Sequence, residues 1–345
     1  MLRTARLAVA VAATASLTLA AGCGQGDNGD QTIGSGLDEL IELAQQEGEL
    51  NYYGSANPAL LDSIIPAFEQ KYGITVNVTR LNSGELGQRF LAEGRNSPAD
   101  VVEVPVLLFD LQPDLFVELS EDEVPGWADY PQEARPSDRY ITGYTSPWAI
   151  LWNTDLVSPA DAPTGWQDLI DPRWQGQFVL TDPRSSDSYM GWADSMAQRF
   201  GIEFLQTIGA GNPPLASSGA AGIQQVAAGE YPIGFMHYAG NVIPFQEEGA
   251  PLEYLIVDDP PHILPMNIGA TVNAPNPNAA RLFVHYRMLQ EAHVLQCDAA
   301  PQGSPLSLNG EIPSCLEMPT GWQSYNQDLT DDRRNELLDA LGIRD

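Results

Sequence analysis

Apolar residues recur at helical spacing in some segments of the chain and form short strand-like runs between them. Residues 37–44 predict a helix, and residues 50–53 predict the strand that follows it. The same unit repeats, with an apolar stripe over 60–68 and a predicted strand over 74–79. A further strand is predicted over 101–104. Alternation of this kind is typical of βαβ units, so the pattern predicts an α/β fold with a mainly parallel sheet.

A second series of elements begins near residue 149 and predicts a second α/β lobe. Its predicted strands cover 149–152, 177–181, 214–217, 233–236 and 252–257, and a helical stretch covers 189–200. The last third of the chain contains a predicted strand at 267–272 and a long helix from 277 to about 295. We expect this helix to return to the first lobe.

The amino terminus has the profile of a secretory signal peptide. Arg3 and Arg6 precede an uncharged run over 7–21, which is shorter than the roughly 20 residues that a membrane-spanning helix needs. Small residues lead directly into Cys23, an arrangement that resembles the bacterial lipobox. We therefore expect residues 1–22 to be removed and Cys23 to carry lipid, the alternative being ordinary cleavage beside a chance cysteine. The glycine-rich polar stretch 23–36 is then a flexible tether.

The other two cysteines are predicted to form a disulfide. Assigning Cys23 to lipid leaves Cys297 and Cys315 as an even pair in an oxidising compartment. The alternative of two free thiols is rare outside the cytoplasm.

Charge and length narrow the class of protein further. The formal net charge of −30 makes nucleic acid an improbable partner. About 310 residues remain after the tether, which is more than one hydrophobic core usually supports, so two lobes are expected. We expect the protein to act as a monomer.

Seven segments along the mature chain resemble a known family. They are FEQKYGI (68–74), SGEL (83–86), SPADV (97–101), DPRWQG (171–176), DPRSS (182–186), VAAGEYPI (226–233) and APNPNAA (274–280). In order and spacing they are similar to bacterial type II periplasmic binding proteins of the extracellular solute-binding family 1. That group contains receptors for ferric iron, thiamine, polyamines and aminoethylphosphonate that serve ABC importers.

The resemblance implies two Rossmann-like lobes with mainly parallel sheets, joined by crossing hinge strands. Lobe I would comprise 49–143 plus 264–345, and lobe II 144–263. The lobes would close over a small-molecule ligand and deliver it to an ABC permease, with the protein lipid-anchored on the extracytoplasmic face of the cell membrane.

Ligands of open α/β sheets bind beyond the carboxyl ends of the strands, where helices begin. Four predicted helix starts are rich in hydroxyl or amide groups, at 55–57, 82–84, 185–188 and 217–219, and two of them have an arginine close by, Arg80 and Arg184. Such donors suit a carboxylate, phosphate or phosphonate, although serine and asparagine are also ordinary N-caps. We therefore expect a small polar organic solute, anionic or zwitterionic, in the cleft between the lobes. The candidate ligand-binding residues are Tyr53, Ser55, Asn57, Ser83, Gly84, Arg184, Ser185, Ser186, Tyr189, Ser218 and Tyr238.

Ferric iron is the second choice of ligand. In the iron-binding relatives an adjacent tyrosine pair does most of the binding, and those two positions fall here on Ala239 and Gly240. The relatives' histidine and glutamate positions fall on Asn57 and Pro105. Another arrangement could still bind iron through Tyr238, His237 and Glu103. No other cofactor is expected, and two further histidines, His285 and His293, are expected on the surface.

No catalytic motif supports an enzymatic reading. The sequence lacks G-x-S-x-G, S-x-x-K, H-E-x-x-H and nucleotide-binding G-x-x-x-x-G-K patterns. We therefore predict a binding protein rather than an enzyme. The alternatives are a secreted hydrolase with scattered catalytic groups and a surface sensor that signals to a membrane kinase.

Overall fold

Helices and strands alternate along the chain as the sequence predicts. The computed structural model describes residues 32–105, 107–257, 262–306, 312, 314–317, 323–324 and 328–343. The helices are α1 (Leu37–Glu47), α2 (Pro58–Tyr72), α3 (Ser83–Glu93), α4 (Leu107–Leu111), α5 (Asp187–Phe200), α6 (Ile202–Ala210), α7 (Gly219–Ala227), α8 (Ala239–Glu247), α9 (Pro277–Met288), α10 (Gln290–Ala299) and α11 (Asp331–Ala340). The strands are β1 (Glu49–Gly54), β2 (Thr75–Arg80), β3 (Val101–Pro105), β4 (Ile141–Asn153), β5 (Phe178–Thr181), β6 (Leu215–Ala216), β7 (Ile233–Tyr238), β8 (Leu252–Ile256), β9 (His262–Ala270) and β10 (Gln323–Ser324).

Cys23 and the expected signal peptide lie outside the described residues. Within the described ranges, none of the helices combines the length and hydrophobicity needed to cross a bilayer.

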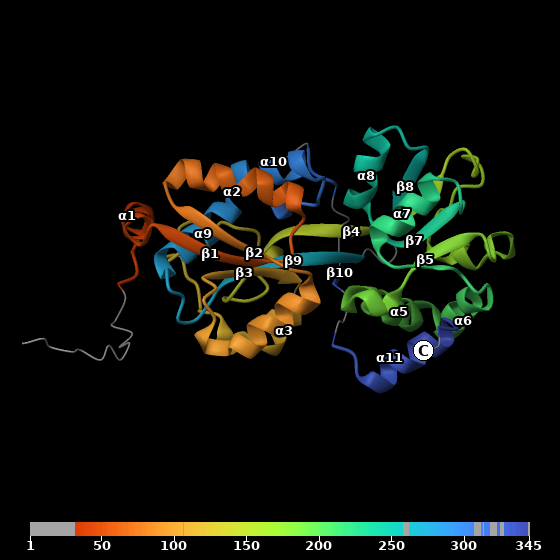
Figure 1. Cartoon of the computed structure of the whole chain (residues 1–345), viewed down its shortest axis with the longest axis horizontal. Coiled ribbons are helices and arrows are strands. Elements are labelled where there is room, and N and C mark those ends of the chain that lie inside the picture. The colour runs from red at the N-terminus through yellow and green to blue at the C-terminus, as the bar shows by residue number, and fades with distance from the viewer. Residues whose placement is uncertain are drawn as a thin grey trace, which may run out of the picture. The chain divides into compact units, whose positions relative to one another are not determined.

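The strands form one continuous sheet in the order β2-β1-β3-β9-β4-β7-β5-β6, with β8 paired to β4 and β10 to β9. Neighbouring strands are parallel toward both ends of this order, in the pairs β1–β2, β1–β3, β5–β7 and β5–β6. The strands between them pair antiparallel, β9 with β3 and β4, and β4 with β7. The predicted α/β fold is thus confirmed, and β4 and β9 are the strands that cross between its two halves (Figure 1).

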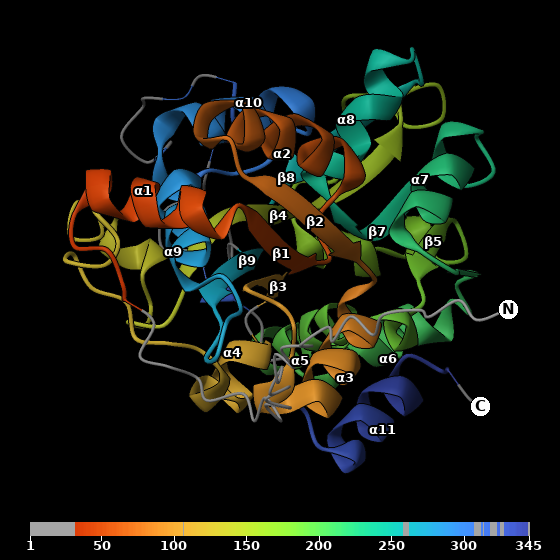
Figure 2. The same cartoon turned by 60° about the vertical axis from the view of Figure 1, so that its left-hand side comes forward.

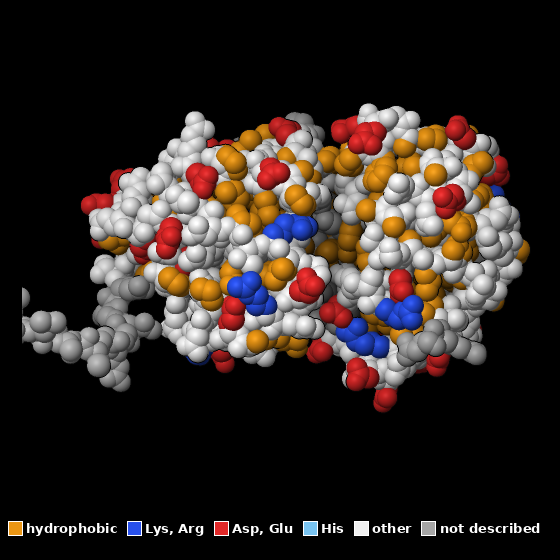
Figure 3. Space-filling model, viewed as in Figure 1, with side chains coloured by type: hydrophobic (Ala, Val, Ile, Leu, Met, Phe, Trp, Pro, Cys, Tyr) orange, Lys and Arg blue, Asp and Glu red, His pale blue; other side chains and the backbone are white. Residues whose placement is uncertain are grey.

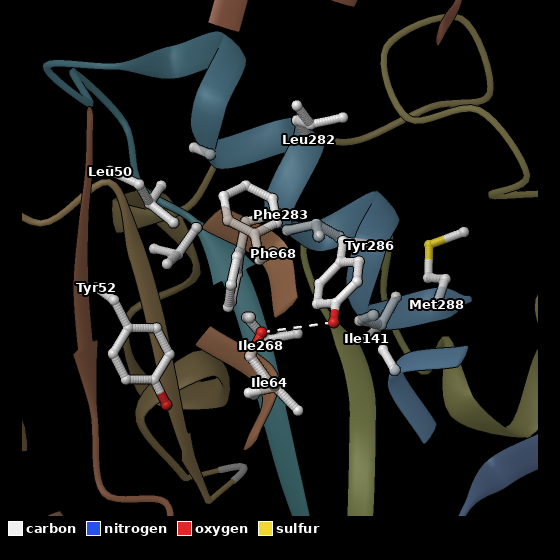
Figure 4. Close-up of a cluster of buried hydrophobic side chains, with 14 of the residues drawn as sticks. Leu50, Tyr52, Ile64, Phe68, Ile141, Ile268, Leu282, Phe283, Tyr286 and Met288 are labelled. Atoms are coloured by element: carbon white, nitrogen blue, oxygen red, sulfur yellow. Dashed lines mark hydrogen bonds between the residues drawn. The ribbon is translucent and has the colours of Figure 1, made fainter. Parts of the chain in front are cut away.

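We call the two halves the first lobe (β1–β3 with α1–α4, α9 and α10) and the second lobe (β5–β8 with α5–α8). The core of the first lobe is built around α9, which lies beside α1 (Figure 2). Figure 4 shows Phe68 and Phe283 next to each other at its centre, and their rings lie edge to face with centroids 5.0 Å apart. Tyr286 donates a hydrogen bond to the Ile64 carbonyl at 3.4 Å. The second lobe has a separate core that includes Trp166, which lies edge-on to another tryptophan in α5.

The final helix corrects one part of the predicted lobe assignment. Leu337 and Leu341 are buried in the second-lobe core, and α11 packs against α5 and α6. The expectation that all of 264–345 belongs to the first lobe is therefore wrong for α11. Arg333 strengthens this attachment, because its Nε donates to Asp194 of α5 at 2.7 Å. The other lobe boundaries stay a prediction.

The long helix predicted from residue 277 to about 295 is two helices. Leu289 has an extended backbone with φ −75° and ψ 142°, which separates α9 from α10. His285 and His293, expected on the surface, are buried. The ring of His285 contacts the Pro125 carbonyl at 2.6 Å, and that of His293 lies 2.8 Å from the Ser304 hydroxyl. The prediction failed because other chain segments cover both helices on several sides.

The predicted disulfide is confirmed. Cys297, near the end of α10, is bonded to Cys315, and their Cα atoms are 4.9 Å apart. Within the loop that this bond closes, Gly303 exchanges two backbone hydrogen bonds with Thr145 of β4, each 2.9 Å long. The bonded loop is thereby attached to a crossing strand.

Candidate solute-binding cleft

Three helices begin at one cavity between the two lobes. Each has a side-chain cap: Asn82 accepts from the backbone of α3 at 2.9 Å, Ser186 from α5 at 3.2 Å and Ser218 from α7 at 3.2 Å. The cavity has a volume of about 600 Å³. Figure 3 shows the hollow on this face of the molecule, between the lobes. Backbone N–H groups and the positive ends of helix dipoles there favour an anion.

The residues around the cavity come from both lobes. From the first lobe they are Asn82, Ser83, Gly84, Gly87, Gln88, Leu91, Val104, Pro105, Leu108 and Leu111, and from the second Arg184, Ser185, Ser186, Asp187, Ser188, Tyr189, Ser217 and Ser218.

Arg184 supplies a cation on the second-lobe side. It follows Asp182, whose carboxylate accepts hydrogen bonds from the Arg184 backbone and guanidinium, with Nη2 to Oδ2 at 2.8 Å. These bonds hold the pKa of Asp182 below its usual value. The pair fixes the direction of the guanidinium, and the side chain remains 40 % exposed where it lines the cavity. A guanidinium held in this way is preorganised for a carboxylate or phosphate.

Aromatic side chains support the same wall from behind. Tyr189 lines the cavity, and its ring stacks on Tyr238 with centroids 6.2 Å apart. Tyr238 in turn lies 4.5 Å from the ring of Trp148, measured between centroids. Burial raises the pKa of Tyr189 to about 12, so its hydroxyl is protonated at neutral pH and can donate a hydrogen bond.

Comparison with known proteins identifies the chain. The family model described as bacterial extracellular solute-binding protein matches residues 63–299. The chain belongs to this family. Like its relatives, this solute-binding protein acts outside the cytoplasm, where it binds the substrate that an ABC transporter imports.

Individual relatives match most of this chain. Iron uptake protein A1 of Synechocystis is 23% identical over 281 residues, which cover 73% of this chain and 74% of that protein. The Trichodesmium protein IdiA (FutA), solved with iron and citrate, has a TM-score of 0.70 and 21% identity, covering 86% of this chain and 100% of that one. AfuA of Actinobacillus pleuropneumoniae, solved with fructose-6-phosphate, has a TM-score of 0.68 and 20% identity, covering 86% and 99%.

The structure of the solute-binding protein brings most of the predicted ligand-binding residues together. Those that line the cavity are Ser83, Gly84, Arg184, Ser185, Ser186, Tyr189 and Ser218. Ser55 lies directly behind, since its hydroxyl accepts from that of Ser83 at 3.0 Å. The other three have structural contacts instead. Asn57 caps α2, the Tyr53 hydroxyl accepts from Arg89 at 2.7 Å, and Tyr238 packs behind Tyr189.

Sequence reasoning missed the part of the first-lobe wall that lies beyond Ser83 and Gly84. Gln88, Leu91, Leu108 and Leu111 line it, although none was a candidate. A signal was present, because Ser83, Gly87 and Leu91 recur at a spacing of four and therefore share one face of α3.

The alternative iron arrangement does not form in this structure. Both carboxylate oxygens of Glu103 are engaged inside the first lobe, one with Arg287 at 3.0 Å and the other with the Tyr52 hydroxyl at 2.7 Å. His237 is buried in the second lobe, where a Cβ on Gly222 would come within 2.7 Å of its ring. Burial lowers the pKa of His237 to about 3. Among the described residues, no three His, Cys, Asp or Glu side chains form a group that could hold a metal.

Proposed function

We propose that this solute-binding protein captures a small organic anion in the cleft and delivers it to an ABC permease. The observation that carries the proposal is the convergence of the α3, α5 and α7 N-termini on a cavity that Arg184 also lines. The lobes would close about β4 and β9 when the anion bridges them. We propose that the protein does so as a monomer and without chemical conversion of the ligand.

Two relatives support an organic anion. AfuA was solved with fructose-6-phosphate, and IdiA with iron and citrate. A phosphate ester and a carboxylate both match hydroxyl donors, helix N-termini and a guanidinium.

Ferric iron is the second candidate because a curated relative is named an iron uptake protein. Iron bound directly by protein needs several hard oxygen ligands. Among the described residues that line the cavity, Asp187 carries the one carboxylate, and it is 2.8 Å from Arg334. A ferric complex whose organic anion contacts the protein fits these residues better than the bare ion.

Thermal unfolding with a ligand panel tests the proposal. The panel contains inorganic phosphate, fructose-6-phosphate, citrate, ferric citrate and ferric iron without a carboxylate. A ligand present at 100 times its dissociation constant stabilises the native state by about 2.7 kcal/mol, so binding raises the melting temperature. Stabilisation by organic anions supports the proposal. Stabilisation by ferric iron alone would favour the second candidate, and ligand recovered in altered form would indicate a hydrolase.

Replacing Arg184 with alanine is expected to weaken binding of any stabilising anion by about 10–100-fold, because a charge-assisted hydrogen bond is lost. Titration calorimetry measures the change. Arg173→Ala is a matched control, since Arg173 also follows an Asp-Pro pair, with its backbone N–H 2.9 Å from the Asp171 carboxylate, but does not line the cavity. Equal losses in the two variants would remove Arg184 from the site.

We also propose that Cys23 anchors the protein by lipid after residues 1–22 are removed. Cys23→Ser is expected to abolish labelling by an alkyne-tagged fatty acid and to move the protein from the detergent phase to the aqueous phase in Triton X-114 partitioning. Cys297→Ser, which leaves Cys23 in place, is the control and should still be labelled. A Cys23→Ser protein that still partitions into detergent would exclude this anchor.

A further inference from the structure

The two walls of the cleft differ in chemistry. Among the described residues, the second-lobe wall consists mainly of hydroxyl groups, together with the Arg184 guanidinium and the Asp187 carboxylate. Across from it, Leu91 and Leu111 are 44% and 48% exposed, and they border the same cavity as Leu108 and Val104. A single exposed leucine is ordinary, but several apolar side chains around one cavity form a surface that a ligand can cover.

The first-lobe wall also has a strip of bare helix backbone. Apart from the backbone of α3 itself, a Cβ placed on Gly87 would meet none of the described residues within 4 Å, and one on Gly84 would meet only the Asn82 side chain at 3.6 Å. Glycine is unfavourable inside a helix, so two glycines in one face of α3 reduce its stability. Neither is required by close packing, and neither has a positive φ. Their effect is to leave the helix open to the cavity.

The dimensions of this wall suit an extended molecule. Ser83 stands at the start of α3, where the anion-binding groups gather, and Leu91 is eight residues further along. At about 1.5 Å per residue, the two positions are about 12 Å apart along the helix axis. A ligand whose charged group lies at the helix N-termini can therefore extend past Gly87 to Leu91.

We propose that the protein selects organic anions with an apolar body of several carbons. The anionic group lies between Arg184 and the helix N-termini, and the body lies along the glycine strip against Leu91, Leu108 and Leu111. Burying that body removes apolar surface from water on both the ligand and the leucines. The inference rests on the proposed function, since it assigns the second half of the same ligand.

Matched pairs of anions test the inference by titration calorimetry. Phenyl phosphate is compared with inorganic phosphate, and phenylacetate with acetate, so that the two pairs also distinguish a phosphate from a carboxylate head. We expect the phenyl compound of the preferred pair to bind at least tenfold more tightly than its parent anion, because its ring covers the leucines.

Substitutions test whether the first-lobe wall causes the preference for phenyl anions. Leu91→Ser is expected to lower the ratio of phenyl phosphate to phosphate affinity by about fivefold. Leu156→Ser is the control, because Leu156 is similarly exposed, at 51%, and does not line the cavity. Gly87→Gln should also lower the ratio, while raising the melting temperature of the ligand-free protein by about 2 °C through its better helix propensity. A purely structural role for Gly87 would not give these opposite effects.

The outcomes separate the two proposals. Equal affinities for phenyl and parent anions, both weakened by Arg184→Ala, would overturn the inference and leave the proposed function intact. An unchanged ratio in Leu91→Ser would overturn it as well. Failure of all four anions to bind at millimolar concentration would overturn the inference, and failure of citrate and fructose-6-phosphate as well would overturn the proposed function.

Discussion

Replacing Arg287 with methionine is expected to lower the free energy of unfolding by about 3–5 kcal/mol. Arg287 and Glu103 form an ion pair in which both side chains are 0% exposed. The same Nη2 that contacts Glu103 also donates to the Gln296 side chain at 3.0 Å. Methionine would leave the Glu103 carboxylate buried without its cation, and an uncompensated buried charge is among the most destabilising changes in a protein.

Urea unfolding measures this effect, and two further variants interpret it. Arg173→Met breaks an exposed pair with Asp161 and should cost no more than about 1 kcal/mol. Adding Glu103→Gln to Arg287→Met removes the stranded charge and should restore part of the lost stability. A loss below 1 kcal/mol for Arg287→Met alone would show that the buried pair does not support the fold in this way.

Reducing the disulfide is expected to lower the free energy of unfolding by about 3 kcal/mol. Cys297 and Cys315 are 18 residues apart in sequence, and the bond restricts the unfolded chain by closing a loop of that size. Comparing urea midpoints with and without a phosphine reductant measures the change.

The variant in which Cys297 and Cys315 are both replaced by alanine separates the bond from side effects of the reductant. Without reductant, its urea midpoint should already be as low as that of the reduced parent protein, and adding reductant should not lower the midpoint further. Identical midpoints for oxidised and reduced parent protein would show that the bond restricts the unfolded chain too little to matter.

Local sequence patterns were sufficient to predict much of the fold and the polar residues of the cleft. Helical stripes, strand-like runs and N-capping residues are local signals. The capping serines of α5 and α7 could be placed because parallel strands bring the following helix starts to one edge of the sheet. The family resemblance then indicated which of these helix starts face each other.

Features that depend on contacts between distant segments could not be predicted in this way. Whether α11 packs on the first or the second lobe depends on which lobe offers an unfilled apolar face, and the sequence of α11 carries little amphipathic pattern. His293 is buried against Tyr130, which is 163 residues away in sequence. The apolar wall was missed because, in the sequence, Leu91 looks like a core residue of its helix. Only the structure shows that it is exposed and borders the cavity.

Strand β4 pairs with strands of both lobes. Residues 141–147 of β4 pair with β9, and 148–153 pair with β7 and β8, so its hydrogen bonds run continuously from one core to the other. If either core unfolds, β4 loses the strand partners on that side, and its position in the other core is no longer fixed. The lobes are therefore separate in packing but coupled in unfolding, and a solute that stabilises one stabilises both.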